Sequence, residues 1–490
     1  MRRSLICLVV ALQLAPAAAL AQSLQRRLDR LLDAPPFDRA LWGVIVTDST
    51  GRVLYARNAD RLFVPASNTK LVVAAAASAL LPVDSRIETS VYGTGPIDDG
   101  TLQGNLVVYG RGDPTFSTRC YGTDTLALGA CELAWDRLDA MADSVRARGI
   151  RHVTGSLVGD GSYFTGPLFH ADWNVYDLNW WYAAPVSGLG FNDNAVDITW
   201  GPGPAAGAPA AVTLTPDVGL VRFENRTSTV DSAARTTVDF YRTPGTWDVW
   251  ADGVVAAQRA PVTEYFALPD PDLFFAAAFR VALARHGVSV AGTTLSTTDS
   301  LGYRAARAGP ALVTYAGRPR DDILFPILNT SQNWFAEMLL KTLGRRVAGT
   351  GSWTAGLGVE RRFLVDSVRA DSTGFTLSDG SGLSTGNLVA PRTFGALLRY
   401  MWSHPSRAGF LRALPRSGQP GSLRTRFVGT PLEGRVIAKT GSIAHVNALS
   451  GYIERPARGP LVFSVMVNHH TVGGRTVLQQ IDSIVVQMAR

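Results

Sequence analysis

The spacing of apolar residues divides the chain into three regions with different predicted structure. In the first region, apolar residues recur at helical spacing over Leu24–Leu32, and two short apolar runs, Leu41–Val46 and Val53–Tyr55, flank a turn. An Ala-rich run then predicts a buried helix over Leu71–Leu81. A helix, a hairpin and a buried helix in this order are typical of the start of an α/β domain with an antiparallel sheet.

The second region, from about Glu88 to Ala308, has short apolar runs separated by turns rich in Gly, Pro and Thr. Two helical runs interrupt it, Leu133–Arg148 and Leu273–Arg285, and the stretch from Gly201 to Ala210 predicts a surface loop. The predicted strands include Leu106–Tyr109, Val153–Val158, Val196–Ile198 and Val238–Tyr241. This pattern predicts a β-rich insertion.

The third region begins with one long helical run, Ile323–Arg345, and ends with an amphipathic helix, Val477–Met488. Further helices are expected at Val359–Val368 and Thr393–Trp402, and strands at Arg435–Lys439, Ala448–Ile453 and Leu461–Val467. We therefore predict an α/β (α+β) fold in which residues 22–87 and 309–490 build one domain with an antiparallel sheet flanked by helices, and residues 88–308 are inserted into it.

The first 21 residues match a secretory signal peptide. They contain Arg2-Arg3, an apolar run too short to span a bilayer, and an A-x-A cleavage site at Ala19-Leu20-Ala21. We therefore expect a secreted, periplasmic protein, in which Cys120 and Cys131 either form a disulfide or remain free thiols. A chain of 490 residues with 46% hydrophobic residues should then form two or three globular domains.

The net charge of +7 does not indicate a nucleic-acid partner, because no run of Lys or Arg is longer than two residues. For a secreted protein, such a charge gives at most a mild, peripheral attraction to anionic cell-wall polymer or to a membrane surface. Seven histidines without an H-E-x-x-H or clustered Cys/His pattern predict no metal site, and no motif indicates a cofactor. We expect His445 near the edge of the functional site, and His469-His470 on the surface.

Lysine is unusually scarce in this chain: of 47 Lys and Arg residues, only Lys70, Lys341 and Lys439 are lysine. Arginine carries surface charge equally well but cannot be deprotonated, so a retained lysine suggests a task that needs a compact or neutral amine. Two of the three lie in motifs, S-x-x-K at Ser67–Lys70 and K-T-G at Lys439–Gly441. With ordinary composition, this coincidence has a probability well below about one per cent. Between them, Ser331-Gln332-Asn333 matches S-x-N.

These motifs predict nucleophilic catalysis. Ser67 and Lys70 share a helical face, and a partly desolvated Lys70 that faces Lys439 would have a depressed pKa and could accept the Ser67 proton. Ser331 could relay the proton to a leaving amine, and Asn333 could hold a substrate amide. Lys439 and Thr440 could bind a substrate carboxylate. The backbone N–H groups of Ser67 and Ser442 could form an oxyanion hole, and Gly441 would let the substrate backbone approach closely.

Other interpretations of the same residues exist. Ser67 and Ser331 could be helix-capping residues, and Lys439 a solvated strand residue. A second candidate nucleophile, Ser384, lies in Gly382–Gly386, which matches G-x-S-x-G. A nucleophile elbow needs an apolar strand before the serine, whereas the preceding stretch, Ser378–Ser381, is polar and Gly-containing. We therefore expect this pattern to be a loop.

The chain resembles the class C low-molecular-mass penicillin-binding proteins, which are D-alanyl-D-alanine carboxypeptidases and endopeptidases acting on peptidoglycan. The similarity rests on Pro65–Leu71, Ser331–Asn333, Asp379–Ser384 and Lys439–Gly441, with the long insertion between the first two motifs. It covers nearly the whole chain after the signal segment.

The resemblance implies that Ser67 is acylated by peptidoglycan stem peptides or cross-links, and by β-lactams as covalent inhibitors, and that water then frees the enzyme. It also implies two nested β-rich subdomains in the insertion, one of which contributes an acidic residue toward the diaminopimelate side chain. Asp160 is similar to that residue, although it could equally be a turn aspartate. Where relatives usually carry a basic residue after Gly-Leu-Ser, this chain has Thr385-Gly386, so its stem-peptide recognition need not match theirs.

Three functions fit these observations. The first is a D-Ala-D-Ala carboxypeptidase with endopeptidase activity. The second is a β-lactamase or an esterase on the same fold; the long insertion argues against a compact β-lactamase. The third is a penicillin-binding module that is acylated without turnover, which the complete set of Ser67, Lys70, Ser331 and Lys439 argues against.

Overall fold

The computed structural model describes residues 24–117, 119, 133–231, 233–455 and 458–490. The expected signal peptide, Cys120 and Cys131 lie outside these ranges, so cleavage and the disulfide stay predictions. The chain forms two compact units. The first consists of the chain up to Val83, Leu324–Ser331 and Leu357–Arg490, and the second of Asp84–Ile323 and Gln332–Gly356. None of the helices among the described residues has the length and apolar character needed to cross a membrane.

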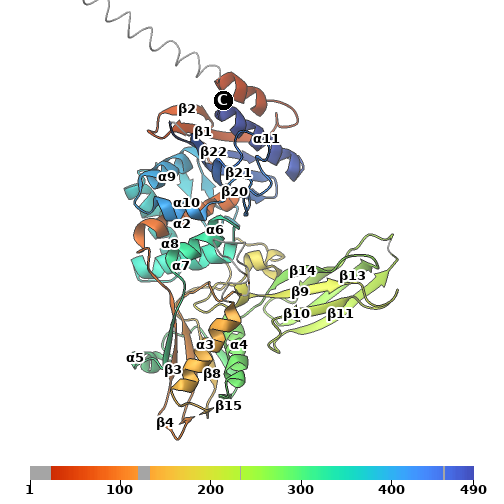
Figure 1. Ribbon diagram of the computed structural model, residues 1–490, viewed down its shortest axis with the longest axis vertical. Coiled ribbons are helices and arrows are strands. Elements are labelled where there is room, and N and C mark those ends of the chain that lie inside the picture. The colour runs from red at the N-terminus through yellow and green to blue at the C-terminus, as the bar shows by residue number, and fades with distance from the viewer. Residues whose placement is uncertain (1–23, 118, 120–132, 232, 456–457) are drawn as a thin grey trace, which may run out of the picture. The chain divides into compact units, whose positions relative to one another are not determined.

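The first unit is built on a five-stranded sheet in the order β2-β1-β22-β21-β20, with every neighbouring pair antiparallel, as predicted (Figure 1). Its strands are β1 (Leu41–Asp48), β2 (Val53–Arg57), β20 (Val436–Ile443), β21 (Val446–Arg455) and β22 (Arg458–Asn468). Strands from both ends of the chain therefore meet in one sheet.

Side chains alternate between the two faces of this sheet, as the pleat of a strand requires. Trp42, Val44 and Val46 of β1 join the core formed with the helix at residues 24–32 and with α11 (Gly474–Met488). On the other face, β1 packs against α9 (Pro391–Ser403), and Gly43 allows Phe63 and Pro391 to lie directly on the strand. Because β1 is covered on both faces, its sequence reads as a nearly continuous apolar run.

The helices of the third predicted region depart from the prediction at three points: one expected helix is split, the helix expected at Val359–Val368 begins earlier, at Trp353, and Arg407–Ala413 was not predicted as a helix. Residues 332–356 of this region belong to the second unit. The expected single helix Ile323–Arg345 is two helices, α6 (Arg320–Leu328) and α7 (Asn333–Ala348). They separate because Ser331 has a positive φ of 67° and the side chain of Gln332 caps α7. The other elements are η1 (Ala66–Thr69), α2 (Lys70–Leu80), α8 (Trp353–Arg362), η6 (Phe363–Ser367), β18 (Phe375–Thr376), β19 (Leu388–Val389) and α10 (Arg407–Ala413).

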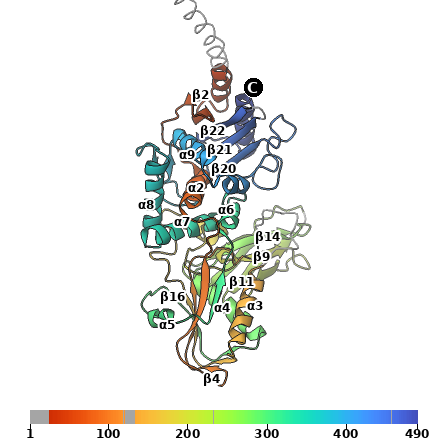
Figure 2. The ribbon, with the colours of Figure 1, turned by 60° about the vertical axis from the view of Figure 1, so that its left-hand side comes forward.

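The second unit contains a five-stranded sheet in the order β16-β8-β6-β3-β17, against which α3 (Ala134–Ala147) and α4 (Pro271–Arg285) pack (Figure 2). On the other side of this sheet, α5 (Arg304–Ala308) contributes Ala306 to a small cluster with Tyr92, Val107 and Val158. The strands are β3 (Glu88–Gly93), β6 (Leu106–Gly110), β8 (Leu157–Asp160), β16 (Thr294–Thr297) and β17 (Val313–Ala316). A short four-stranded sheet consists of β15 (Ser289–Val290), β7 (His152–Val153), β5 (Thr101–Leu102) and β4 (Ile97–Asp98).

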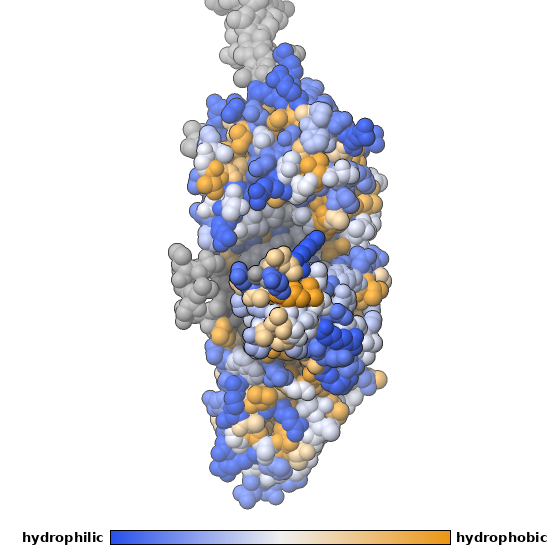
Figure 3. All heavy atoms as spheres, turned by 90° about the vertical axis from the view of Figure 1, so that its right-hand side faces the viewer, coloured by the Kyte–Doolittle hydropathy of each residue, from blue (hydrophilic) through white to orange (hydrophobic). Residues whose placement is uncertain are grey.

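Two three-stranded sheets complete the second unit. They have the orders β10-β9-β14 and β11-β13-β12, and the predicted loop around residues 202–210 joins β9 to β10. Their strands are β9 (Ala195–Gly201), β10 (Ala211–Thr215), β11 (Arg222–Val230), β12 (Asp239–Arg242), β13 (Asp248–Ala256) and β14 (Val262–Ala267). Three short helices precede β9 in the chain: η3 (Asp177–Asn179), η4 (Trp181–Ala183) and η5 (Asn192–Asn194). On the face seen in Figure 3, hydrophilic and hydrophobic residues are interspersed.

Candidate active site

The first predicted motif forms a hydroxyl–amine pair. Ser67 lies in η1, and Lys70 begins α2 immediately after it, so the two side chains lie on one side of the same turn. Lys70 Nζ lies 2.8 Å from Ser67 Oγ and donates a hydrogen bond of 2.7 Å to the backbone carbonyl of Ser381. Lys70 is completely buried, whereas Ser67 is only half-buried. A fully desolvated amine therefore touches a hydroxyl that remains accessible.

The turn that carries Ser67 is held by unusually close backbone contacts. Ala66 has a positive φ of 47°, and the Thr69 hydroxyl donates to its carbonyl over 2.9 Å. Gly382, with a φ of 83°, approaches the same carbonyl so closely that a Cβ at this position would collide with it. Only glycine fits there, because both the backbone angle and the available space exclude a side chain.

The loop from Ser378 to Asn387 is organised by one carboxylate. Asp379 accepts hydrogen bonds of 2.7 Å from the backbone N–H groups of Gly382 and Ser384 and from the Asn387 amide. Ser384 is fully buried, and its hydroxyl accepts a hydrogen bond from the backbone of Gly386. The G-x-S-x-G pattern is thus a loop, as expected, and Ser384 stabilises it.

The K-T-G motif lies inside β20 and not at the end of a strand, as the apolar pattern had suggested. Lys439 Nζ donates hydrogen bonds of 2.8 Å to Ser331 Oγ and to the carbonyl of Thr440. Burial, and then the charge of Lys70, hold the pKa of Lys439 well below the usual lysine range. The structure thus brings Ser67, Lys70, Ser331 and Lys439 together as two adjacent serine–lysine pairs.

Close packing between η1 and the sheet fixes the first pair relative to the second. A Cβ on Gly441 would lie 2.6 Å from the carbonyl oxygen of Pro65, so the glycine lets β20 lie directly against η1. The Asn68 amide donates to Ser450 Oγ over 2.7 Å, and Ser450 donates in turn to Ser464 over 2.8 Å. These contacts are all buried, which makes the relative position of the two motifs rigid.

The rest of β20 presents two further hydroxyl groups. Thr440 Oγ1 donates to Ser422 Oγ over 3.0 Å, and Ser442 is exposed, with its hydroxyl accepting from Asn447 over 3.1 Å. Sequence reasoning missed Ser422 because it belongs to no motif. It also missed Ser381, whose contribution is a backbone carbonyl that no residue type specifies.

Two predicted site residues, Asn333 and Asp160, belong to the second unit. Asn333 is the first residue of α7, and its side-chain amide donates to the carbonyl of Tyr182 over 2.8 Å. Asp160 is buried, forms an ion pair with Arg307 and accepts a hydrogen bond of 3.0 Å from the backbone of Ser162. Their parts in substrate recognition stay predictions.

The histidines near β20 differ from the expectation in one respect. His445 is exposed, and its Nδ1 is hydrogen-bonded to the carbonyl of His470 over 2.9 Å. His469 is exposed, as expected. His470 is buried, and its Nε2 is hydrogen-bonded to Asn447 Oδ1, so the prediction that His470 lies on the surface was wrong. Within the described ranges, no three His, Cys, Asp or Glu side chains gather as a metal site would require.

A buried amine within hydrogen-bond distance of an accessible serine hydroxyl, beside a second lysine–serine pair, is the arrangement expected of a serine enzyme with a lysine base. The family model for the D-Ala-D-Ala carboxypeptidase 3 (S13) family matches residues 24–488. The chain therefore belongs to this family, which confirms the resemblance drawn from its motifs.

Individual relatives agree with this assignment. A D-alanyl-D-alanine carboxypeptidase of Actinomadura sp. (strain R39) is 35% identical over 480 residues, which cover 95% of this chain and 84% of the relative. DacB of Haemophilus influenzae, a D-alanyl-D-alanine carboxypeptidase, is 24% identical over 428 residues, covering 85% and 82% of the two chains.

Solved structures share the fold. The crystal structure of penicillin binding protein 4 (dacB) from Haemophilus influenzae has a TM-score of 0.81 at 23% identity, covering 94% of this chain and 99% of its own. A second structure of that protein, complexed with a novel β-lactam, has a TM-score of 0.76 at 21% identity over the same shares.

Proposed function

We propose that this protein is a serine D-alanyl-D-alanine carboxypeptidase, with endopeptidase activity, that cleaves peptidoglycan stem peptides or cross-links through an acyl-enzyme on Ser67. The observation that carries the proposal is the 2.8 Å contact between the buried Lys70 amine and the Ser67 hydroxyl. Family membership supplies the substrate class, and the geometry supports the roles that we propose for the residues.

In the acylation step, neutral Lys70 accepts the Ser67 proton while Ser67 Oγ attacks the carbonyl of the penultimate D-alanine. An ester bond to Oγ forms as the C–N bond to the terminal D-alanine breaks. The leaving nitrogen needs a proton, and Ser331, hydrogen-bonded to Lys439, is placed to relay it. The backbone N–H groups of Ser67 and Ser442 would stabilise the oxyanion. Water then hydrolyses the ester, and the serine is regenerated.

The second lysine explains how the first can be neutral. Two ammonium groups in one buried site repel each other, so the state in which only one of the two lysines is protonated is favoured. A substrate carboxylate that binds near Lys439 and Thr440 would draw this proton to Lys439 and leave Lys70 as the free base. Substrate binding would thus activate the nucleophile, and a substrate without a carboxylate would lose this advantage.

Other features of the proposal follow from the family. β-Lactams should acylate Ser67 in the same way as the substrate, because they present a strained amide and a carboxylate to the same groups. The protein should act in the periplasm or outside the cell, where peptidoglycan lies, with no nucleic-acid partner. Its charge of +7 would favour peripheral contact with the anionic wall or membrane surface.

Incubation of the protein with a stem pentapeptide tests this proposal, with Ser67→Ala as the control. We expect the wild type to release one D-alanine for each pentapeptide consumed, over many turnovers, and the variant to release none. Rapid β-lactam hydrolysis without D-alanine release would identify a β-lactamase or esterase instead. Stoichiometric labelling by a β-lactam without any peptide turnover would identify a penicillin-binding module.

A further inference from the structure

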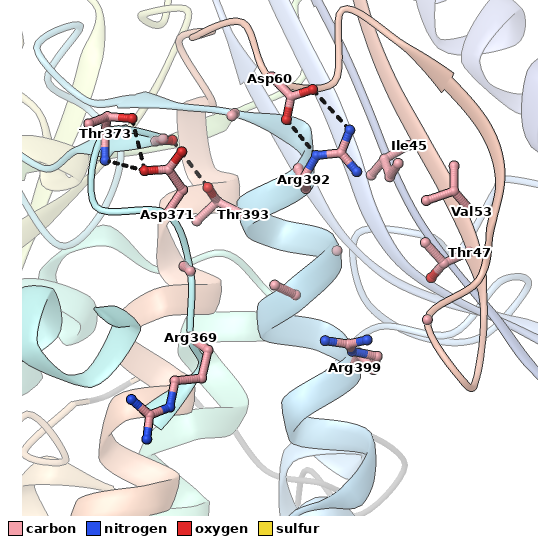
Figure 4. Close-up of a pocket in the computed structure, with 16 residues that line it drawn as sticks. Ile45, Thr47, Val53, Asp60, Arg369, Asp371, Thr373, Arg392, Thr393 and Arg399 are labelled. Atoms are coloured by element: carbon pink, nitrogen blue, oxygen red, sulfur yellow. Dashed lines mark hydrogen bonds and ion pairs between the residues drawn. The ribbon is translucent and has the colours of Figure 1, made fainter. Parts of the chain in front are cut away.

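A second cavity lies in the first unit, between the β1–β2 hairpin and α9, with a volume of about 300 Å³ (Figure 4). Its walls combine strand residues Ile45, Thr47 and Val53 with helix residues Ala396 and Arg399. The cavity is distinct from the catalytic site, because β1 and β20 are separated by three strand spacings, on the order of 15 Å.

One buried polar group in this cavity, the Thr47 hydroxyl, has no partner among the described residues. Thr47 is only 8% exposed, and its hydroxyl makes no hydrogen bond to any described residue. It lies on the same face of β1 as Ile45, which also lines the cavity, because residues two apart in a strand point the same way. A buried hydroxyl without a partner costs free energy, so an occupant that bonds to it would be stabilised.

The charged groups lie on opposite walls. Arg399 reaches from α9 to Gly51 in the β1–β2 turn, and across the described part of the chain it has no hydrogen bond or ion pair. Asp371 stands on the other wall, where one of its oxygens accepts two hydrogen bonds of 2.9 Å from Thr373 (Figure 4). The other charged lining residues are Arg369 and the ion pair between Asp60 and Arg392.

Small residues keep the space between these walls open. Gly374, Ala390 and Ala396 line the cavity and offer little more than backbone and methyl groups. A volume of about 300 Å³ lies at the lower end of the range for small-molecule pockets, which suits an amino acid or a dipeptide better than a larger peptide.

From this arrangement we propose that the cavity is a second binding site for a short zwitterionic molecule, an amino acid or dipeptide with small apolar side chains. Arg399 would bind its carboxylate, Asp371 its ammonium group and the Thr47 hydroxyl a further polar atom, while Ile45 and Val53 contact its side chains. We identify the ligand as D-alanine, which the catalytic site would release, or D-alanyl-D-alanine, whose structure it would recognise. This identification rests on the proposed function.

The test is calorimetric titration of the β-lactam-acylated protein, in which Ser67 is blocked, with D-alanyl-D-alanine. We expect saturable binding with a single site. N-acetyl-D-alanyl-D-alanine, which lacks the ammonium group, and inorganic phosphate, which lacks both the ammonium group and the apolar body, should bind about ten-fold more weakly or not at all. Phosphate binding equal to that of the dipeptide, or no saturable binding of the dipeptide, would overturn the proposal.

Variants locate the site. Arg399→Met and Thr47→Val should each weaken dipeptide binding by about ten-fold, whereas Arg362→Met, at an exposed arginine of the same unit that does not line the cavity, should leave it unchanged. Ala396→Leu should abolish binding by filling the space, and it keeps the proposal testable if Thr47→Val does not fold. Equal binding by all variants would place the ligand elsewhere and refute the assignment.

Comparison of the stereoisomers identifies the source. Tighter binding of D-alanyl-D-alanine than of L-alanyl-L-alanine would assign the site to the reaction's own products, and equal binding would assign it to amino acids in general. Both results support a zwitterion site. Because the titration needs no turnover, it can succeed even if the pentapeptide assay shows no D-alanine release, so the two proposals fail independently.

Discussion

The three lysines of this protein are all buried, but in two different settings. In the first unit, Lys70 and Lys439 each contact a serine hydroxyl and lie close enough for the charge of one to lower the pKa of the other. In the second unit, Lys341 donates to the carbonyls of Pro167 and Val186 and lies 3.8 Å from the centroid of the Trp353 ring. Burial also lowers the pKa of Lys341, to about 8.

This comparison separates what burial does from what the partner does. Both settings depress a lysine pKa through desolvation, but only the first supplies a hydroxyl that can give up its proton. The amine of Lys341 instead holds two carbonyls of the segment that precedes η5, against an aromatic ring. In this protein, a depressed lysine pKa therefore does not by itself mark the predicted catalytic lysine; the serine hydroxyl beside Lys70 does.

The largest expected effect comes from Lys70→Arg. A guanidinium does not release its proton, so this variant should lose its base, and acylation by a β-lactam or a pentapeptide should fall by about 10³-fold or more. Burst kinetics of β-lactam labelling measure this rate, and thermal unfolding shows whether the variant is folded. Near-normal acylation by a folded K70R protein would show that Lys70 is not the base.

Removal of the second lysine tests the repulsion within the pair. Lys439→Gln should lower acylation by about ten- to a hundred-fold, because it removes a charge-assisted contact to the substrate and to Ser331. Without the second charge, the remaining amine holds its proton to a higher pH, so the acidic limb of the rate–pH profile should move upward. An unshifted limb would mean that the two amines do not interact.

Lys341→Met should affect stability more than catalysis. Loss of the two hydrogen bonds to carbonyl oxygens should lower the free energy of unfolding by about 1–3 kcal/mol, while kcat changes little. The folded pKa of Lys341, about 8, lies below the unfolded value of 10.5, so its burial penalty is full below pH 8 and is relieved as the pH rises toward 10.5. The wild type should therefore gain stability relative to the variant across this window. Denaturant titration at both ends of the window measures the difference, and a constant difference would contradict the assignment.

The smallest effect should come from Thr440→Val. This change removes a hydroxyl that we expect to bind the substrate carboxylate, so KM should rise about three- to ten-fold with little change in kcat. Thr440→Ser keeps the hydroxyl and serves as the matched control. Unchanged kinetics in T440V would remove Thr440 from the binding site.

The sequence predicted the local part of the site well, because Ser67 and Lys70 lie three residues apart in one helical turn and their contact follows from helix geometry. It predicted the break at Ser331 poorly. The polar run Asn329–Asn333 was included in one helical stretch, although the break there depends on the positive φ of Ser331 and on the cap made by the Gln332 side chain. The contacts of Ser381 and Ser422 were not predictable either. One is made by a backbone carbonyl, and the other depends on how a loop outside every motif packs against β20.

The hairpin formed by β18, β19 and the loop between them connects the second cavity to the catalytic site. Gly374 and Ala390, at the base of this hairpin, line the second cavity, and Ser381, in its loop, bonds the amine of Lys70. A ligand bound at the base of the hairpin would change the conformational freedom of the same loop whose Ser381 carbonyl positions the Lys70 amine. Its effect on turnover should thus appear as a change in maximal velocity at unaltered substrate affinity, the signature of a non-competitive effector.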